Sequence, residues 1–325
     1  MAGPSIRLVV PYFGERPSYF PLVLRSMAAN PDVHWLLLTE RPVPGAPPNL
    51  TVRLCEFADL VSRIQGHFDF EVCLPRPYKL CDVRPAFGEV FRDELAGWDF
   101  WGHCDLDVLF GQIRQHLPAE ALAADKVLVQ GNFALYRNTA EAAGWFRSEI
   151  DGVSYRDVLT EPAARHFDEW AGIYLVLRDL GVSIWQEETI FDLSFARYRT
   201  RAEHPPGRDP RRYAWEDGQV CEYRLERGAL VRRTALLVHL QKRVMRAPAA
   251  EVLVADRYWI TANGFAVQRR VSPWAVRAAR IPAGAELLPF YVRRVQRAVR
   301  RRAARRRRAD RPDRSRLGAS PRMGS

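Results

Sequence analysis

Short apolar runs alternate with amphipathic stretches of helical length, and this alternation most constrains how the chain can fold. Apolar runs predict buried strands over 6–10, 33–39 and 50–55, and the first of them ends at Pro11. Helical patterns follow the first and third of these runs, over 19–29 and 56–68. Strands that alternate with helices of about ten residues or more are typical of an α/β sandwich with a mostly parallel sheet.

The same alternation continues to about residue 150. It predicts a helix, three strands and a second helix, over 79–95, 99–104, 125–129, 133–136 and 139–149.

The pattern changes at about residue 213. Turn signals at 216–218 and 226–228 flank two strand patterns, which predicts a β-hairpin, and 236–239 is a last strand-like run. We therefore expect one α/β domain over residues 1–260, followed by a less regular extension over 261–290 and a tail over 291–325.

The net charge of +11 is concentrated in the tail. Residues 291–325 hold 14 arginines and 2 aspartates, a formal charge of +12, which leaves −1 for residues 1–290. Self-repulsion and few apolar residues favour a mostly disordered tail that is solvated or attracted to anionic lipid head groups. Nucleic-acid binding is disfavoured, because no aromatic residue is interleaved after Tyr291.

The cysteines and the N-terminus bear on the compartment. The five cysteines form no CxxC pair, so we expect reduced thiols rather than a zinc site or a disulfide framework. The N-terminus lacks a basic region before a long apolar core, and no apolar run approaches the ~20 residues of a membrane span. The expected location is cytoplasmic, with peripheral attachment to the inner face of the membrane through the tail as an option.

Two aspartates, Asp105 and Asp107, directly follow the Trp-rich strand pattern at 99–104. In an extended segment residues i and i+2 project to the same side, so both carboxylates can share one cation, or one can hold the metal while the other bonds a ribose hydroxyl. Such hard oxygen ligands suit Mg²⁺ or Mn²⁺. A solvated turn is the alternative, because Asp-x-Asp recurs by chance, but a position at the carboxyl end of a buried strand favours the metal site.

Three further groups of residues each allow two interpretations. His239 is a suitable third ligand for Mn²⁺, with Lys242 and Arg243 as donors to a diphosphate, although spacing alone favours a histidine packed at a strand end. Lys79, Asp82 and Arg84 lie about a turn apart if helical, and could bind a ligand or form surface ion pairs. Asp168 and Glu169 lie between aromatic residues, as a general base and acceptor-binding pair or as acids at a helix N-terminus.

Five blocks of sequence carry a resemblance to a known family. They are VPYFG at 10–14, PYKLCD at 77–82, WGHCDLD at 101–107, LYRN at 135–138 and HLQKR at 239–243. Over about residues 6–246 the chain resembles a largely uncharacterised bacterial family of glycosyltransferase-like proteins, many of which accompany surface-polysaccharide genes. More distantly it is similar to the nucleotide-sugar transferases of the GT-A fold, especially glycosyltransferase family eight.

The resemblance implies a GT-A-like, Rossmann-like mixed sheet and a role for particular residues. By motif, it makes Asp105, Asp107 and His239 the ligands of Mn²⁺ or Mg²⁺, and Lys242 the diphosphate contact. Pro11, Tyr12 and Phe13 would line the nucleoside pocket. Apart from the resemblance, we expect the nucleotide sugar to be bound by Lys79, Asp82, Arg84 and Asp105 as well. Asp168 would lie near the acceptor and the anomeric carbon, and we expect Asp168 or Glu169 to orient or deprotonate the acceptor hydroxyl. The chain departs from family eight after His239, where the spacing to Lys242 is shorter, and at Asp168-Glu169, where that family has Asp-Gln.

These expectations predict transfer of a hexose from a nucleoside diphosphate sugar to a saccharide or lipid-linked glycan acceptor, in surface polysaccharide biosynthesis. Two other classes remain open. A metal-dependent nucleotidyltransferase or phosphotransferase also uses paired aspartates, but it usually adds a Gly-rich phosphate loop, and the sequence has none. A non-enzymatic protein would bind membrane or nucleic acid through the basic tail.

Overall fold

The computed structural model describes residues 3–150, 152–194, 210–241 and 243–278. The arginine-rich tail and Lys242 lie outside the described residues, so the disorder expected of the tail stays a prediction. Within the described part of the chain, no helix has both the length and the apolar character needed to cross a membrane.

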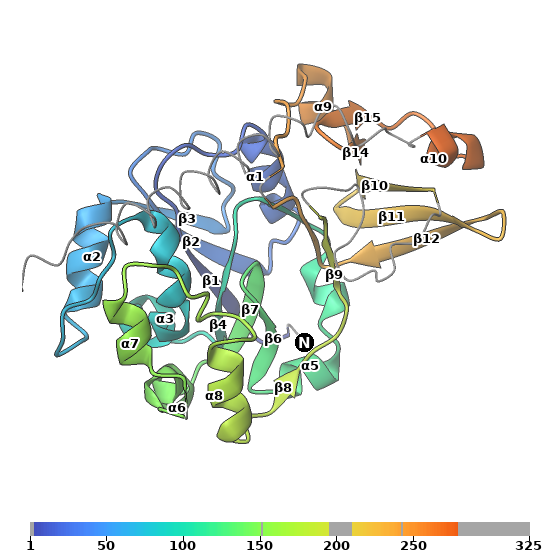
Figure 1. Cartoon of the computed structure of the whole chain (residues 1–325). Helices are drawn as coiled ribbons and strands as arrows, with labels where there is room; N and C mark the ends of the chain where they lie inside the picture. Colours follow the sequence, from blue (N-terminus) through green and yellow to red (C-terminus); the bar gives the residue numbers. More distant parts are fainter. Residues whose placement is uncertain (1–2, 151, 195–209, 242, 279–325) are drawn as a thin grey trace, which may run out of the picture. The chain divides into compact units, whose positions relative to one another are not determined.

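A seven-stranded mixed sheet forms the centre of the fold, with the strand order β3-β2-β1-β4-β7-β6-β8 (Figure 1). Its strands are β1 (Ile6–Pro11), β2 (Val33–Thr39), β3 (Leu50–Leu54), β4 (Phe100–Cys104), β6 (Lys126–Gln130), β7 (Phe133–Arg137) and β8 (Ile184–Trp185). β1 is parallel to both β2 and β4, whereas β7 is antiparallel to β4 and β6. The sheet confirms the predicted α/β class.

Alternating side chains of the central strands enter different cores, as the two-residue period of a strand requires. Leu8 and Val10 pack in a core with residues of α1 (Phe20–Ala28), whereas Val9 packs in a second core with residues of α2 (Phe57–Gln65). The second core also takes residues from helices that cover this face of the sheet. These are α3 (Phe87–Val90), α4 (Arg92–Leu95), α6 (Ala140–Gly144), α7 (Tyr155–Thr160) and α8 (Ile173–Asp179). The helix α5 (Ala119–Ala123) contributes Ala121 to the first core.

The single helix predicted over 79–95 is wrong. The segment folds as two 3-10 helices, η1 (Pro77–Asp82) and η2 (Arg84–Ala86), before the short α3 and α4. Pro85 lacks the N–H that an α-helix needs in its interior. The helix predicted over 139–149 is also shorter, because α6 ends at Gly144 and a 3-10 turn, η4 (Trp145–Arg147), follows.

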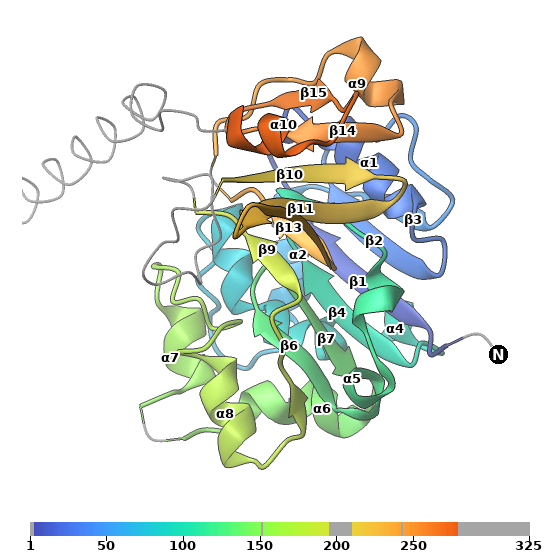
Figure 2. The same cartoon turned by 90° about the vertical axis from the view of Figure 1, so that its right-hand side faces the viewer.

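A five-stranded antiparallel sheet follows in the C-terminal part, in the order β12-β11-β10-β14-β15 (Figure 2). It consists of β10 (Arg211–Glu216), β11 (Gln219–Glu226), β12 (Ala229–Ala235), β14 (Arg257–Ile260) and β15 (Phe265–Val267). The hairpin β11–β12 is confirmed, and the turns at 217–218 and 227–228 have positive φ at both central residues, as tight hairpins favour. α9 (Ala250–Val254) precedes β14, and α10 (Pro273–Ala278) packs against β10 and β11.

A small third sheet joins distant parts of the chain. In it β13 (Leu237–His239) is antiparallel to β5 (Val108–Phe110) and parallel to β9 (Ile190–Asp192). The indole Nε1 of Trp215 in β10 donates to the carbonyl of Phe110 over 3.0 Å, which ties the five-stranded sheet to β5. This arrangement places the strand that follows the Asp-x-Asp sequence beside two strands from much later in the chain.

Candidate active site

The carboxyl ends of β1 and β4 mark a switch point of the main sheet. From β1 the chain continues to β2 on one side, whereas β4 lies parallel to β1 on the other side. In open α/β sheets, ligands bind in the crevice that such a reversal leaves beyond the strand ends. Tyr12 follows β1 and Asp105 follows β4, so both lie at this edge.

Asp105, Asp107 and His239 meet at the switch point. The imidazole Nε2 of His239 lies 3.7 Å from Oδ2 of Asp105 and 3.3 Å from Oδ1 of Asp107. One ligand atom from each residue can be chosen so that all three lie within 4.8 Å of one another. The strand register of the third sheet brings His239 next to the two aspartates. His239 pairs with Val108, and the amide of Leu240 donates to the carbonyl of Asp107 over 2.8 Å.

The far side of the His239 ring is held by polar residues. Its Nδ1 lies 2.8 Å from Oδ1 of Asp192 and 3.0 Å from Nδ2 of Asn132. Gln241, which has a positive φ, donates from Nε2 to the same Asp192 oxygen over 2.6 Å. A carboxylate that accepts from one ring nitrogen fixes the other nitrogen toward a metal, as in carboxylate–histidine–metal triads.

Charge is concentrated at this cluster. Burial alone would lower the pKa of His239, but hydrogen bonds with Asp107 and Asp192 raise it to about 10. Burial raises the pKa of Asp107, with the neighbouring Asp105 acting in the same direction and His239 opposing it. Without a metal, a protonated His239 supplies the positive charge that the two carboxylates require.

The donor set fits a hard divalent cation. Two carboxylates and one imidazole are suitable ligands for Mn²⁺, and Mg²⁺ takes carboxylate oxygens at about 2.0–2.1 Å, which places neighbouring octahedral ligands about 3 Å apart. The spacings of 3.3 and 3.7 Å around Nε2 of His239 are close to that value. The three residues therefore fit the predicted ion with only small side-chain movements.

Arg84 links the cluster to a second acidic group. Its guanidinium forms an ion pair with Asp105 through Nη2, and through Nη1 it contacts Oδ2 of Asp168 at 2.9 Å and the carbonyl of Gly131 at 2.5 Å. The expected contact of Arg84 with the nucleotide sugar stays a prediction. A Cβ on Gly131 would lie 2.8 Å from Oε1 of Glu169, so a larger residue there would require the Glu169 side chain to move.

Asp168 and Glu169 differ in exposure. Asp168 is 1% exposed, and burial raises its pKa to about 6, although Arg84 opposes the shift. The side chain of Glu169 is 45% exposed and lies 3.9 Å from Nδ1 of His166. Both precede α8 in a loop rather than occupying its first turn. Of the two carboxylates, Glu169 is the one that a solvent-borne substrate can reach.

Lys79 and Asp82 form a buried ion pair rather than a surface one. Nζ of Lys79 lies 2.6 Å from Asp82 and donates to the carbonyls of Val158 at 2.6 Å and Ala163 at 2.9 Å. Both side chains are fully buried. These partners give the pair a role in holding the chain together, and the expected contact with a nucleotide sugar stays a prediction.

Residues 11–13, at the carboxyl end of β1, were expected to line the nucleoside pocket, and their surroundings differ. Burial raises the pKa of Tyr12, and the charges of Asp107 and Asp105 add to the shift, which places the phenol near the acidic cluster. Phe13 is buried and packs edge-on against Phe57, with ring centroids 5.3 Å apart. Pro11 ends β1 and is half-buried. Tyr12 is therefore the member of the trio that faces the site.

Asp192 and Asn132 were not predicted as site residues. Asp192 ends a three-residue strand, and Asn132 lies in the turn between β6 and β7. Each contacts a histidine far along the chain, so no local spacing could have indicated them.

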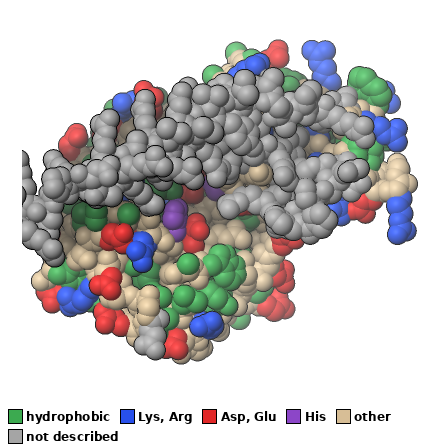
Figure 3. Space-filling view, viewed as in Figure 1, with side chains coloured by type: hydrophobic (Ala, Val, Ile, Leu, Met, Phe, Trp, Pro, Cys, Tyr) green, Lys and Arg blue, Asp and Glu red, His purple; other side chains and the backbone are tan. Residues whose placement is uncertain are grey.

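On the face seen in Figure 3, the acidic and basic side chains that are visible among the described residues are interspersed. This agrees with the near-neutral charge of residues 1–290.

Comparison with known proteins gives a family and a structural likeness. A search of curated proteins found no match. Among solved structures, the chain is similar to the galactosyltransferase LgtC, crystallised in complex with donor and acceptor sugar analogues. The identity is 14%, the TM-score is 0.39, and the match covers 73% of this chain and 88% of that chain, which is too low a similarity to assign an activity. The model of a family of unknown function, DUF6625, matches residues 8–269. The chain belongs to this family, DUF6625.

Proposed function

We propose that this chain is a metal-dependent glycosyltransferase that moves a sugar from a nucleoside diphosphate sugar to a saccharide or lipid-linked glycan acceptor. The observation that carries the proposal is the meeting of Asp105, Asp107 and His239 at the switch point of the main sheet. The cation is Mn²⁺ or Mg²⁺, and when bound it neutralises charge on the departing diphosphate. A cytoplasmic location and a role in surface polysaccharide synthesis belong to the same proposal.

The residues of the chain position the reactants. Tyr12 lines the pocket for the nucleoside, because it follows β1 and lies near the carboxylates of Asp105 and Asp107. Asp192 holds the His239 ring so that Nε2 faces the cation. Lys242 comes three residues after His239, and its predicted contact with the diphosphate lies outside the described residues.

The acceptor hydroxyl is oriented or deprotonated by Glu169. The exposed side chain of Glu169 lies beside Gly131, close to the Arg84–Asp168 pair that connects to Asp105. Asp168 has one oxygen on Arg84 and is buried, so we assign it to positioning. This refines the expectation that either acid acts on the acceptor.

The test is a product assay with UDP-, GDP- and CMP-linked sugars in the presence of Mn²⁺. We expect release of the free nucleotide, and Asp107→Asn to lower the rate about 100-fold or more, as loss of a group that stabilises transition-state charge does. Asp93→Asn, at an exposed position on α4, is the matched control and should keep the wild-type rate. A wild-type rate in Asp107→Asn would refute the metal site. In a parallel assay with a nucleoside triphosphate and a sugar phosphate, release of pyrophosphate would indicate a nucleotidyltransferase instead.

A further inference from the structure

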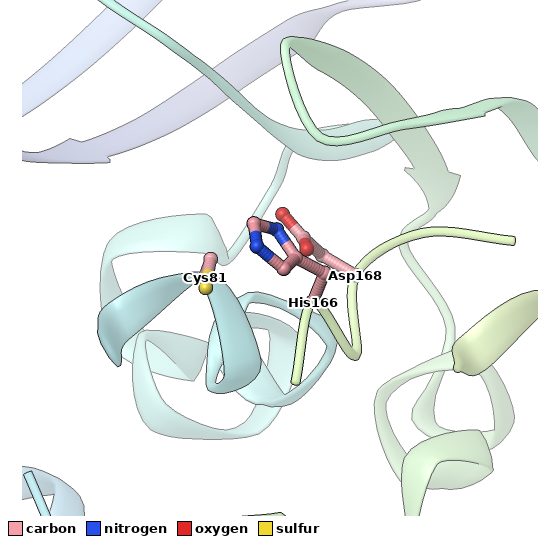
Figure 4. Close-up of side chains that lie close together, drawn as sticks. All are labelled: Cys81, His166 and Asp168. Carbon is pink, nitrogen blue, oxygen red and sulfur yellow. The ribbon is translucent and has the colours of Figure 1, made fainter. Parts of the chain in front are cut away.

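A second group of ligand-type side chains lies on the other side of Asp168. Cys81 belongs to η1, and His166 and Asp168 belong to the loop that precedes α8. One ligand atom from each can be chosen so that all lie within 4.8 Å of one another. Figure 4 shows the imidazole of His166 beside the carboxylate of Asp168, with Cys81 on the neighbouring helix. Unlike the first cluster, this one contains sulfur.

The loop is fixed to η1 by a buried acid. Asp82, next to Cys81, accepts hydrogen bonds from the backbone amides of Arg165 at 2.9 Å and Phe167 at 2.8 Å. Its charge is matched by Lys79 at 2.6 Å. Since these bonds lie on either side of His166, they hold its backbone beside Cys81 before any ligand binds.

One carboxylate oxygen of Asp168 is buried without a hydrogen-bond partner among the described residues. Oδ2 contacts Arg84, whereas Oδ1 is buried and has no hydrogen-bond partner among the described residues. An unmet acceptor in a side chain that is 1% exposed is costly, at about 1–3 kcal/mol, unless a further donor or cation meets it. This oxygen is an independent indication that something binds here.

The imidazole has polar neighbours that can support ligation. The hydroxyl of Tyr78 lies 3.4 Å from Nε2 of His166, and Oε1 of Glu169 lies 3.9 Å from Nδ1. Whichever ring nitrogen binds a metal, the other has an oxygen nearby to fix the ring. His166 also has a positive φ, which an ordinary residue rarely adopts.

We propose that Cys81, His166 and Asp168 form a second metal site, selective for a thiophilic transition metal of the Zn²⁺ type. Thiolate, imidazole and carboxylate are Zn²⁺ ligands, with bonds of about 2.3, 2.0–2.1 and 2.0–2.2 Å, and sulfur disfavours Mg²⁺ and Mn²⁺. Because Zn²⁺ is usually four-coordinate, three protein ligands leave one coordination position open. The thiolate and the carboxylate together balance the charge of the ion, and the thiol proton leaves to solvent.

The site goes beyond the proposed function and does not depend on it. A metal here would tie the loop to η1 on one side of Asp168, while Arg84 holds the other oxygen. Arg84 connects this site to Asp105, so a bound metal would restrict the movement of Arg84 and of Asp105 in the first cluster. No CxxC spacing exists to reveal such a site, because the ligands are separated by 85 residues along the chain between Cys81 and His166.

The test is a Co²⁺ titration of the full-length, reduced, metal-free protein, with Zn²⁺ as competitor. Thiolate ligation gives a sulfur-to-cobalt charge-transfer absorption that the carboxylate–histidine cluster cannot give. We expect the absorption in the wild type, its displacement by Zn²⁺, and its loss in Cys81→Ser, with Zn²⁺ affinity lowered more than about 100-fold. Cys73→Ser, another half-buried thiol, is the matched control and should keep it.

Two further variants make the outcome decisive. Asp107→Asn should keep the absorption, which separates this site from the proposed catalytic one. His166→Ala, at an exposed position, should weaken Co²⁺ binding even if Cys81→Ser does not fold. Absence of the absorption in folded wild-type protein, or its persistence in Cys81→Ser, would overturn the proposal.

Discussion

Replacing Arg84 by Met should destabilise the protein in a pH-dependent way. The substitution keeps much of the volume but removes the charge that faces Asp105 and Asp168. Asp105 is 27% exposed, so water can compensate for the loss there, whereas Asp168 is buried. Breaking a buried pair and leaving one charge behind costs about 3–5 kcal/mol. We take about 3 kcal/mol, which corresponds to a Tm lower by about 6–12 °C for a domain of this size.

The pH dependence follows from Asp168. Its pKa in the folded protein, about 6, is above the ordinary value, so its favourable contribution is present at low pH and is lost as pH rises through about 6. Without Arg84 the pKa should rise further, because the charge that opposes burial is gone. The deficit of Arg84→Met should therefore be large at pH 8 and smaller at pH 5.

The assay is thermal unfolding of metal-free protein, followed by circular dichroism at pH 5 and pH 8. Arg165→Met is the control, since the Arg165–Glu161 pair is exposed on both sides and should contribute about 1 kcal/mol or less. Adding Asp168→Asn to Arg84→Met should recover part of the loss at pH 8. A variant as stable as the control at pH 8, or an equal deficit at both pH values, would refute the reasoning.

Three other predictions concern different parts of the fold. Glu94→Gln should lower the free energy of unfolding by about 1 kcal/mol above pH 5, because two arginines overcome the effect of burial and lower the pKa of Glu94 to about 2. When stability is measured as a function of pH, the difference from wild type should vanish as pH falls toward 2. Asp192→Asn should weaken Mn²⁺ binding about 10- to 100-fold in calorimetry, since it removes the carboxylate behind His239. Gly102→Ala should lower the free energy of unfolding by about 3 kcal/mol in denaturant titrations, because its Cβ would lie 2.1 Å from the carbonyl oxygen of Ala134. An unchanged Kd for Mn²⁺ would contradict the Asp192 prediction, and an unchanged unfolding midpoint would contradict the Gly102 prediction.

The sheet could be predicted because its strands are local apolar runs. Leu8, Val9 and Val10 are consecutive apolar residues that enter two cores, and such a run indicates a strand covered on both faces. The hairpin at 219–235 was equally clear from its turn residues. The helix expected over 79–95 failed because the spacing of apolar residues was given more weight than Pro85, which lies in η2 and cannot supply the N–H that a continuous α-helix needs there.

The candidate site was predictable only in part. The spacing of Asp105 and Asp107 predicted that their carboxylates could share a cation, and the resemblance added His239, whose Nε2 lies near both in the structure. The carboxylate behind that histidine, Asp192, depends on the pairing of β9 with β13. The bridge from Asp105 to Asp168 through Arg84 joins positions in three separate segments, and pairings of that kind are set by tertiary packing.

The measurement that tests the central claim most directly is a thermal-shift titration with UDP, GDP, CMP and their sugars, with and without Mn²⁺. A ligand that binds the folded state raises Tm by an amount set by its concentration relative to Kd. We predict that one nucleotide raises Tm only with Mn²⁺, and that the shift disappears in Asp105→Asn and Asp107→Asn but persists in Asp93→Asn. A folded wild-type protein that shows no shift with any of these ligands, or a shift that survives both substitutions, would contradict the account.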